Sequence, residues 1–413
     1  MVTLSLYVQQ PLASVTSPSV SGSAAQIVSL TVIADTRTLC VITRSGDIAI
    51  LPLESDADAN ADGDTPKSLD IVGTLTPSPV LTAALAPDSS LLVIIISSSP
   101  APTLHLMSSS TFTPISSVLL STPHHGAAAP INVGWGSKST QFHGSLGKSA
   151  AEAQPATESG CTTTPDDDSA PRVSWRGDAQ FFVVSTREGG VPGKRVLRVY
   201  NRAGVLQSTA EDVPGLEHVL AWRPNGGLIA GVQRFGKVPT ETEDEKMAWA
   251  LEKGVDGRHD VVFFERNGLR HGDFTLRESS GRMGKHMTND LSINANLTLV
   301  PDRRWRYKVR ELGWNADSSV LSVWIERETC DVGEWLTVIT PLIGSGMCAA
   351  VQLWTTGNYH WYLKLELPAP GACRFTTISW HAEDPLRLFL STAGERIPAA
   401  FLAYLPRKFS NGH

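Results

Sequence analysis

The sequence predicts an all-β protein folded as a β-propeller, and three observations lead to this expectation. The 413-residue chain has a globular composition, with 41% hydrophobic and 18% charged residues. Its 34 glycines and 26 prolines indicate many turns. A short motif, in which an apolar anchor precedes a polar turn and a second apolar strand, recurs along the chain at roughly the spacing of propeller blades.

The recurring motif combines strand and turn chemistry. Its clear copies are "SWRGDAQFFVVS" from Ser174, "AWRPNGGLIAGV" from Ala221 and "GWNADSSVLSVW" from Gly313. Weaker copies start at Ala84, Gly134, Ser379 and Val32. Asp, Asn, Gly and Ser favour the tight turn, and the β-branched and aromatic residues after it favour a strand. Further strands follow each copy, so each unit is expected to form a small antiparallel meander.

The spacing of the motif predicts the number of blades. The anchors are Ile33, Leu85, Trp135, Trp175, Trp222, Trp314 and Trp380. Successive anchors are 52, 50, 40, 47, 92 and 66 residues apart. Four of these steps lie near the length of a WD40-type blade, about 40–45 residues. We therefore expect a seven-bladed WD40-type β-propeller whose four tryptophan anchors from 175 onward lie in the core between blades.

Polar insertions account for the two long steps. They occupy residues 237–257, 277–301 and 329–350. Little β-patterned sequence follows the last anchor, so the last blade is expected to be incomplete unless the N-terminal strand closes it. The predicted domains are a propeller over residues 1–390 and a truncated or aberrant tail over residues 391–413.

Two acidic or polar stretches, residues 54–70 and 152–171, interrupt the first half of the chain. The first 170 residues carry a net charge of −9 and the remainder +3, within a total of −6. The favoured interpretation is solvated loops between strands. The alternative is a phosphorylated or partner-binding segment. The surface as a whole is not that of a polyanion-binding protein.

The cysteines and the hydropathy of the sequence argue against several classes of protein. Five cysteines are scattered, and none forms a Cys-x-x-Cys pair, which argues against a disulfide framework and a zinc site. No basic region precedes an apolar core at the N-terminus, and the longest apolar run, residues 91–96, is far shorter than a membrane span. We expect no membrane association and a cytoplasmic location, with the nucleus as the second choice.

Several motifs suggest chemistry but lack the required spacing. Gly147-Lys148-Ser149 resembles a phosphate loop, but the first glycine of such a loop would fall on Phe142. No catalytic residue and no cofactor is expected. The residues weighed as metal ligands are His124, His125, His143, Asp166, Asp167 and Asp168. Their spacing fits no metal motif, so exposed side chains are the favoured interpretation and no metal is expected.

One basic strip resembles a nucleic-acid groove, because cations alternate with aromatic residues in "RRWRYKVR". The candidate RNA or phosphate contacts are Arg303, Arg304, Arg306, Lys308 and Arg310. The period of two also fits a half-buried strand with a solvated basic face, and this second interpretation is favoured.

Several long blocks of the sequence resemble the N-terminal propeller of the Elongator complex protein 1 family. They are residues 131–151, 173–185, 196–211, 221–230, 260–276, 313–324 and 351–364. The blocks occur in the family's order from about residue 131 to 390, and residues 1–130 fit more loosely. The insertions at 277–301 and 329–350 are unlike the family.

This resemblance implies a non-catalytic scaffold. Its partners would be the other Elongator subunits, including the radical-SAM and acetyltransferase subunit that modifies tRNA wobble uridines, so tRNA would be contacted indirectly. The family's second propeller, solenoid and dimerisation region have no counterpart in these 413 residues. Two alternatives remain: a WD40 interaction adaptor unrelated to Elongator, and a propeller hydrolase with its site in the central channel.

Overall fold

The computed structural model describes most of the β-patterned sequence. The described residues are 3–8, 26–53, 70–75, 78–120, 167–188, 194–235, 259–276, 307–327, 349–357, 360–369, 374–393 and 399–405. Within them, every regular element is a β-strand, and no helix that could cross a membrane is found.

The described strands form six four-stranded antiparallel sheets. The first contains β2 (Ile27–Ile33), β3 (Thr38–Thr43), β4 (Asp47–Pro52) and β5 (Asp70–Thr74). The second contains β6 (Val80–Leu85), β7 (Leu91–Ile96), β8 (Thr103–Ser108) and β9 (Pro114–Leu119). The third contains β10 (Arg172–Trp175), β11 (Phe181–Glu188), β12 (Lys194–Asn201) and β13 (Leu206–Thr209).

The remaining three sheets follow in the second half of the chain. The fourth contains β14 (Leu216–Trp222), β15 (Ile229–Arg234), β16 (His259–Phe264) and β17 (Arg270–Thr275). The fifth contains β18 (Tyr307–Trp314), β19 (Val320–Arg327), β20 (Ala349–Gly357) and β21 (His360–Pro368). The sixth contains β22 (Arg374–Trp380), β23 (Arg387–Ala393), β24 (Ala399–Tyr404) and β1 (Thr3–Val8).

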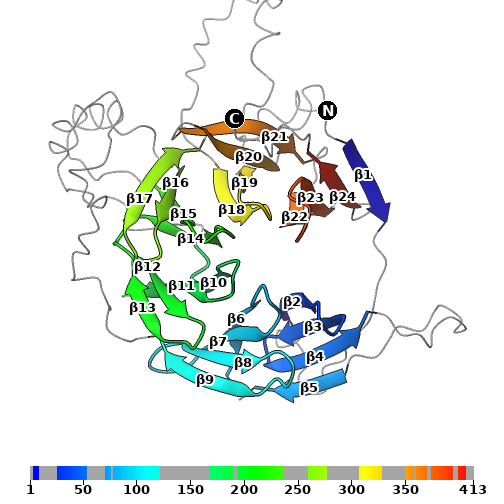
Figure 1. Cartoon of the computed structure of the whole chain (residues 1–413), viewed down its shortest axis with the longest axis vertical. Coiled ribbons are helices and arrows are strands. Elements are labelled where there is room, and N and C mark those ends of the chain that lie inside the picture. The colour runs from blue at the N-terminus through cyan, green and yellow to red at the C-terminus, as the bar shows by residue number, and fades with distance from the viewer. Residues whose placement is uncertain are drawn as a thin grey trace, which may run out of the picture.

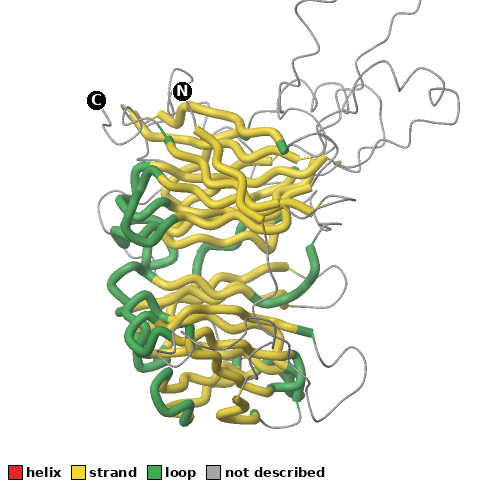
Figure 2. The backbone as a smooth tube through the Cα atoms, turned by 90° about the vertical axis from the view of Figure 1, so that its right-hand side faces the viewer, coloured by secondary structure: helices red, strands yellow, loops and turns green. Residues whose placement is uncertain are grey.

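The six sheets stand around a central opening, and the first strand of each sequence meander lies innermost (Figure 1). β2 packs against β6, β6 against β10, β10 against β14, β14 against β18 and β18 against β22. Seen from the side, the strands run across the thickness of the ring, and the loops lie at its two faces (Figure 2). The predicted all-β propeller is therefore confirmed.

The predicted number of seven blades is not confirmed. The third expected anchor, Trp135, lies outside the described residues. The described sheets on either side of that stretch are in direct contact, because β6 packs against β10 and the Arg202 guanidinium forms an ion pair with Asp88 at 2.7 Å.

The N-terminal strand completes the last sheet. β1 pairs antiparallel with β24, from Thr3 opposite Tyr404 to Val8 opposite Ala399. The boundary expected at residue 390 falls inside β23, and the sheet continues to Tyr404. Sequence patterning missed this because the alanine-rich β24 has weak strand propensity of its own and gains its partners from β23 and β1.

The tryptophan anchors lie between sheets, as expected. Trp175, Trp222 and Trp314 are buried, and Trp380 packs on the apolar cluster between the fifth and sixth sheets. Two anchors also bond to the neighbouring sheet through the indole N–H. The Trp175 indole N–H donates to the Ala84 carbonyl of the second sheet at 3.2 Å, and that of Trp380 donates to the Gly313 carbonyl of the fifth at 3.2 Å. Each of these bonds ties a blade to its predecessor.

Five of the six innermost strands carry a β-bulge near the same end. The extra residues are Val28, Leu81, the stretch 217–219, Arg310 and Thr376. In four of these strands the irregular position lies four residues before the anchor. A bulge adds an unpaired residue and turns the adjacent side chains to new directions. The bulges therefore decide which side chains stand at that end of the central opening.

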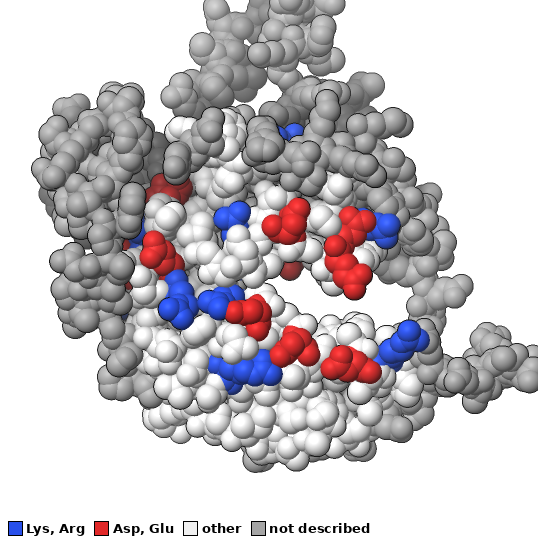
Figure 3. Space-filling model, viewed as in Figure 1, with Lys and Arg blue, Asp and Glu red and all other residues white. Residues whose placement is uncertain are grey.

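The contact between the sixth and first sheets differs from the others. Ile27, Leu30 and Val32 of β2 are all more than half exposed. The space-filling view shows the central opening extending sideways between these two sheets (Figure 3). This is the most open contact between neighbouring sheets among the described residues.

The bond from Trp175 to the second sheet can be tested against a matched anchor. Trp175 and Trp314 are both 8% exposed, but the Trp314 indole N–H has no hydrogen-bond partner within the described structure. Trp175→Phe should therefore lower the free energy of unfolding by about 1 kcal/mol more than Trp314→Phe, because only the first substitution leaves a carbonyl unpaired. Chemical denaturation of the two variants measures the difference. An equal loss in both would show that the bond between sheets adds nothing.

Candidate functional site

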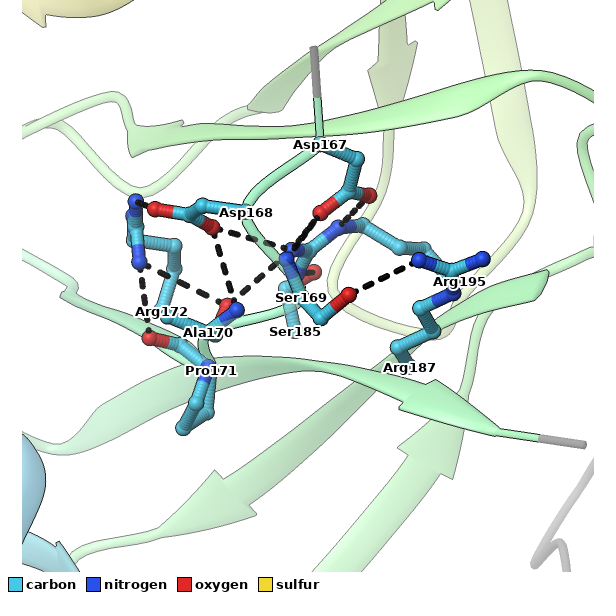
Figure 4. A network of polar contacts seen from close by, with 9 residues as sticks. All are labelled: Asp167, Asp168, Ser169, Ala170, Pro171, Arg172, Ser185, Arg187 and Arg195. Carbon is cyan, nitrogen blue, oxygen red and sulfur yellow. Dashed lines mark hydrogen bonds and ion pairs between the residues drawn. The ribbon is translucent and has the colours of Figure 1, made fainter. Parts of the chain in front are cut away.

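The richest polar cluster in the described structure lies between the third and fourth sheets. We call it the polar seam and define it by Asp167, Asp168, Arg172, Arg195 and His218. The first two precede β10, Arg172 begins β10, Arg195 is on β12, and His218 lies in the bulge of β14. Figure 4 shows how the segment before β10 curls over the guanidinium of Arg195.

Arg195 and Asp167 form the buried centre of the polar seam. Their side chains are 1% and 2% exposed, and two guanidinium nitrogens bind the two carboxylate oxygens. Arg195 also donates to the Ser185 hydroxyl at 3.2 Å and to the Ala170 carbonyl at 3.0 Å. Burial opposes ionisation of Asp167, but the hydrogen bonds and charge of Arg195 outweigh it and hold the pKa of that carboxyl below its usual value. The pair fixes the segment that enters β10.

Asp168 is the exposed member of the polar seam, whereas His218 is buried. Asp168 pairs with Arg172, and its pKa is lowered because the bonds and charge of Arg172 outweigh the effect of burial. Burial lowers the pKa of His218, and the nearby charge of Arg172 adds to the effect. The imidazole therefore stays neutral more readily than an exposed histidine.

Asp167, Asp168 and His218 bring possible metal-ligand atoms within 4.8 Å of one another. The carboxylates are already bound to guanidinium groups of Arg195 and Arg172, so positive charge fills the position that a cation would need. A divalent ion would have to break the buried pair, which leaves an unpaired charge and costs several kcal/mol, roughly 3–5. The donor set fits a closed ion-pair network better than a metal centre.

The structure therefore brings together Asp167 and Asp168, which the sequence analysis considered as metal ligands, and His218, which it did not. Asp167 and Asp168 lie together, whereas Asp166, His124, His125 and His143 are outside the described residues. His218 was not singled out, although its place four residues before an anchor tryptophan is the same as that of Arg310.

Only part of the predicted basic strip can be placed. Arg303, Arg304 and Arg306 lie outside the described residues. Val309 is fully buried, as the alternating pattern predicts, but Arg310 and Glu311 are consecutive exposed residues because of the bulge in β18. Arg310 forms an ion pair with Glu326, and Lys308 is half-buried. The RNA or phosphate contact stays a prediction.

Glu311 has an unusual protonation equilibrium. Glu311 is accessible to solvent and lies on β18, the innermost strand of the fifth sheet. Desolvation by the protein around it raises the pKa of Glu311 to about 7, although the charge of Arg172 on β10 acts in the opposite direction. Glu311 is thus partly protonated near neutral pH.

The face shown in Figure 3 carries charges of both signs around the opening. Among the described residues in this view, Lys and Arg side chains stand beside Asp and Glu side chains and form no single basic or acidic area. The ion pairs of the described turns agree with this, since Arg176 pairs with Asp178, Arg202 with Asp88 and Arg387 with Asp384. The described part of this face therefore offers no continuous electrostatic track for a polyanion.

The fold defines the class of protein: a β-propeller. A family model described as the ELP1 first N-terminal beta-propeller matches residues 3–383, and the chain belongs to this family. Elongator complex protein 1 of Oryctolagus cuniculus is 35% identical over 373 residues, which cover 89% of this chain and 22% of that protein. Elongator complex protein 1 of Saccharomyces cerevisiae is 31% identical over 312 residues, which cover 68% of this chain and 18% of that protein.

The chain spans about a fifth of the length of these curated relatives. Among solved structures, the beta-propeller domain of Cps50 (Swd1) from Myceliophteria thermophila matches with a TM-score of 0.45 and 10% identity, over 92% of this chain and 84% of that one. That likeness is too weak to add to the fold established above.

The raised pKa of Glu311 predicts a pH dependence of stability. In the unfolded chain the carboxyl has an ordinary pKa near 4.5, whereas in the folded protein it is about 7. The folded state therefore binds the proton more tightly, and this group lowers stability as pH rises from 4.5 to 7. Glu311→Gln should make that decline shallower. The free energy of unfolding of the variant minus that of the parent should therefore increase from pH 4.5 to 7.

Denaturant midpoints between pH 4.5 and 8 measure the effect. The matched control is Glu383→Gln, because Glu383 is an exposed glutamate in the turn before β23. A parallel shift of the Glu311→Gln and parent curves over the whole range would contradict the assignment.

Proposed function

We propose that this chain acts in the Elongator complex as a non-catalytic scaffold. In this role its propeller holds other subunits, including the radical-SAM and acetyltransferase subunit, during modification of tRNA wobble uridines in the cytoplasm. Contact with tRNA is indirect. The observation that carries the proposal is the match to the ELP1 first N-terminal propeller over residues 3–383, together with relatives named as Elongator complex protein 1.

The arrangement of strands supports a role in holding partners. In a four-stranded meander, the turns after the first and third strands emerge on one face, and the other connections emerge on the opposite face. Most of the described turns gather on one side of the ring (Figure 2). The strand ends that flank residues 121–166, 236–258, 277–306 and 328–348 all belong to the opposite face. One face is therefore compact and built of short turns, and the longer connections of the chain start from the other.

The tight turns make the compact face rigid. Asp88, Asp178 and Asp317 each accept hydrogen bonds from backbone N–H groups two residues further on. Between blades, Arg223 donates to the Ser318 carbonyl at 2.7 Å, and the Ser318 hydroxyl accepts from the Asn225 N–H at 2.9 Å. A surface held in this way suits a subunit that positions others without moving.

The hydrolase alternative receives no support from the described residues. Propeller enzymes need reactive groups that converge on the opening and are free to act. The described cluster that contains two carboxylates and a histidine is the polar seam, where arginines bind both carboxylates. A WD40 adaptor unrelated to Elongator differs from the proposed scaffold in its binding partners, because it would not bind Elongator subunits.

Co-expression tests the proposal. The tagged chain should co-purify with the catalytic Elongator subunit of its own organism, because the propeller would present the family's contact surface. The control is an unrelated β-propeller of similar size with the same tag. A chain that is folded by circular dichroism and still leaves every Elongator subunit in the flow-through would overturn the proposal and favour an unrelated adaptor.

A further inference from the structure

Ser169 occupies an unusual position at the edge of the polar seam. It is exposed, and its backbone is in the left-handed region with a φ of 61°. Its N–H donates to the Asp167 carboxylate at 2.7 Å, which closes a tight turn. The turn presents the Ser169 hydroxyl to Arg187, whose Nη1 donates to Oγ at 2.8 Å. Figure 4 shows both interactions.

Arg187 carries a charge that no ion pair balances among the described residues. It lies on β11 directly opposite Arg195 on β12, so two like charges share neighbouring positions. The charge of Arg195 is offset by Asp167. Among the described residues, Arg187 forms no ion pair, and its hydrogen-bond partner is the neutral Ser169 hydroxyl. An anion on Ser169 would supply the missing negative charge.

We propose that Ser169 is a phosphorylation site and that Arg187 binds the phosphate. This inference is independent of the proposed function. A protein kinase would supply the phosphoryl group from ATP: the Ser169 oxygen bonds to the γ-phosphorus, the bond from that phosphorus to the bridging oxygen breaks, ADP leaves and the hydroxyl proton passes to the kinase. A phosphoserine carries about −1.5 to −2 charges and three strong acceptor oxygens.

The neighbouring acidic residues do not oppose this phosphate strongly. Asp167 is bound by Arg195, and Asp168 is bound by Arg172. Their charges are thus partly cancelled before the modification occurs. Arg187 already points at the oxygen that becomes esterified, so the new ion pair needs little rearrangement of the segment. The modification would fasten the segment before β10 more tightly to the third sheet.

The first test is chemical. The full chain, purified from its native cells with phosphatase inhibitors, is digested and its phosphopeptides are mapped by mass spectrometry. The proposal expects a phosphate on Ser169 that disappears after phosphatase treatment. A fully covered peptide without phosphate on Ser169 in growing and stressed cells would overturn the assignment of the site.

The second test asks what holds the phosphate. Phosphoserine is incorporated at position 169 during expression, and the thermal midpoint is compared with that of the unmodified chain. A new charge-assisted hydrogen bond should raise the midpoint by about 1–4 °C. Arg187→Gln should abolish this rise, whereas Arg187→Lys should retain part of it because the charge remains.

Phosphoserine at Ser110 is the matched control, because Ser110 is also an exposed turn residue and its hydroxyl bonds to Ser108. It should leave the midpoint unchanged or lower it. If phosphoserine at position 169 fails to raise the midpoint, or raises it equally in the Arg187→Gln variant, Arg187 is not the phosphate-binding residue.

Discussion

Burial of apolar surface between adjacent sheets is the constraint on which the rest of the structure depends. A four-stranded sheet in this ring is apolar on both faces, and it can bury both only with a neighbour on each side. In β11, Phe182 packs toward the second sheet and Val183 toward the fourth. In β19, Val323 packs toward the fourth sheet and Trp324 toward the sixth. No blade could therefore hold its shape alone.

The charged residues of the polar seam lie where this apolar packing ends. Near the strand ends, the apolar contact between the third and fourth sheets gives way to Arg195, Asp167 and their neighbours. Buried charges are tolerated only where they are paired, and here an acidic segment from outside the sheet supplies the partner for an arginine within it. The bulges of the innermost strands act at the same end of the ring, where they bring His218, Arg310 and Glu311 into positions that regular alternation would not give them.

The sequence was informative where one local pattern decided the structure. Each anchor and turn is a local signal with a clear physical cause, so the sheets around Trp175, Trp222 and Trp314 could be placed in advance. Closure of the last sheet by the N-terminal strand was raised as an alternative, but the register of β1 with β24 could not be assigned, because it joins the two ends of the chain and neither strand has a distinctive pattern. The polar seam was missed for a similar reason: its residues come from segments separated by 20 to 50 positions, and only packing of two blades unites them. Alternation held as far as Arg310, which is exposed as predicted, and failed at Glu311, where the bulge leaves a second consecutive residue exposed.

The sixth sheet can bury its apolar surface against its neighbours only if all four of its strands are present. The pairing of β1 with β24 is therefore the most direct point to test. Ser5 lies opposite Leu402 in this pair, and Ala403 lies opposite Leu4. Cysteines at 5 and 402 should form a disulfide under mild oxidation, whereas cysteines at 5 and 403 should not, because successive residues of a strand point to opposite faces. Equal cross-linking in both variants, or none in either, would contradict the account.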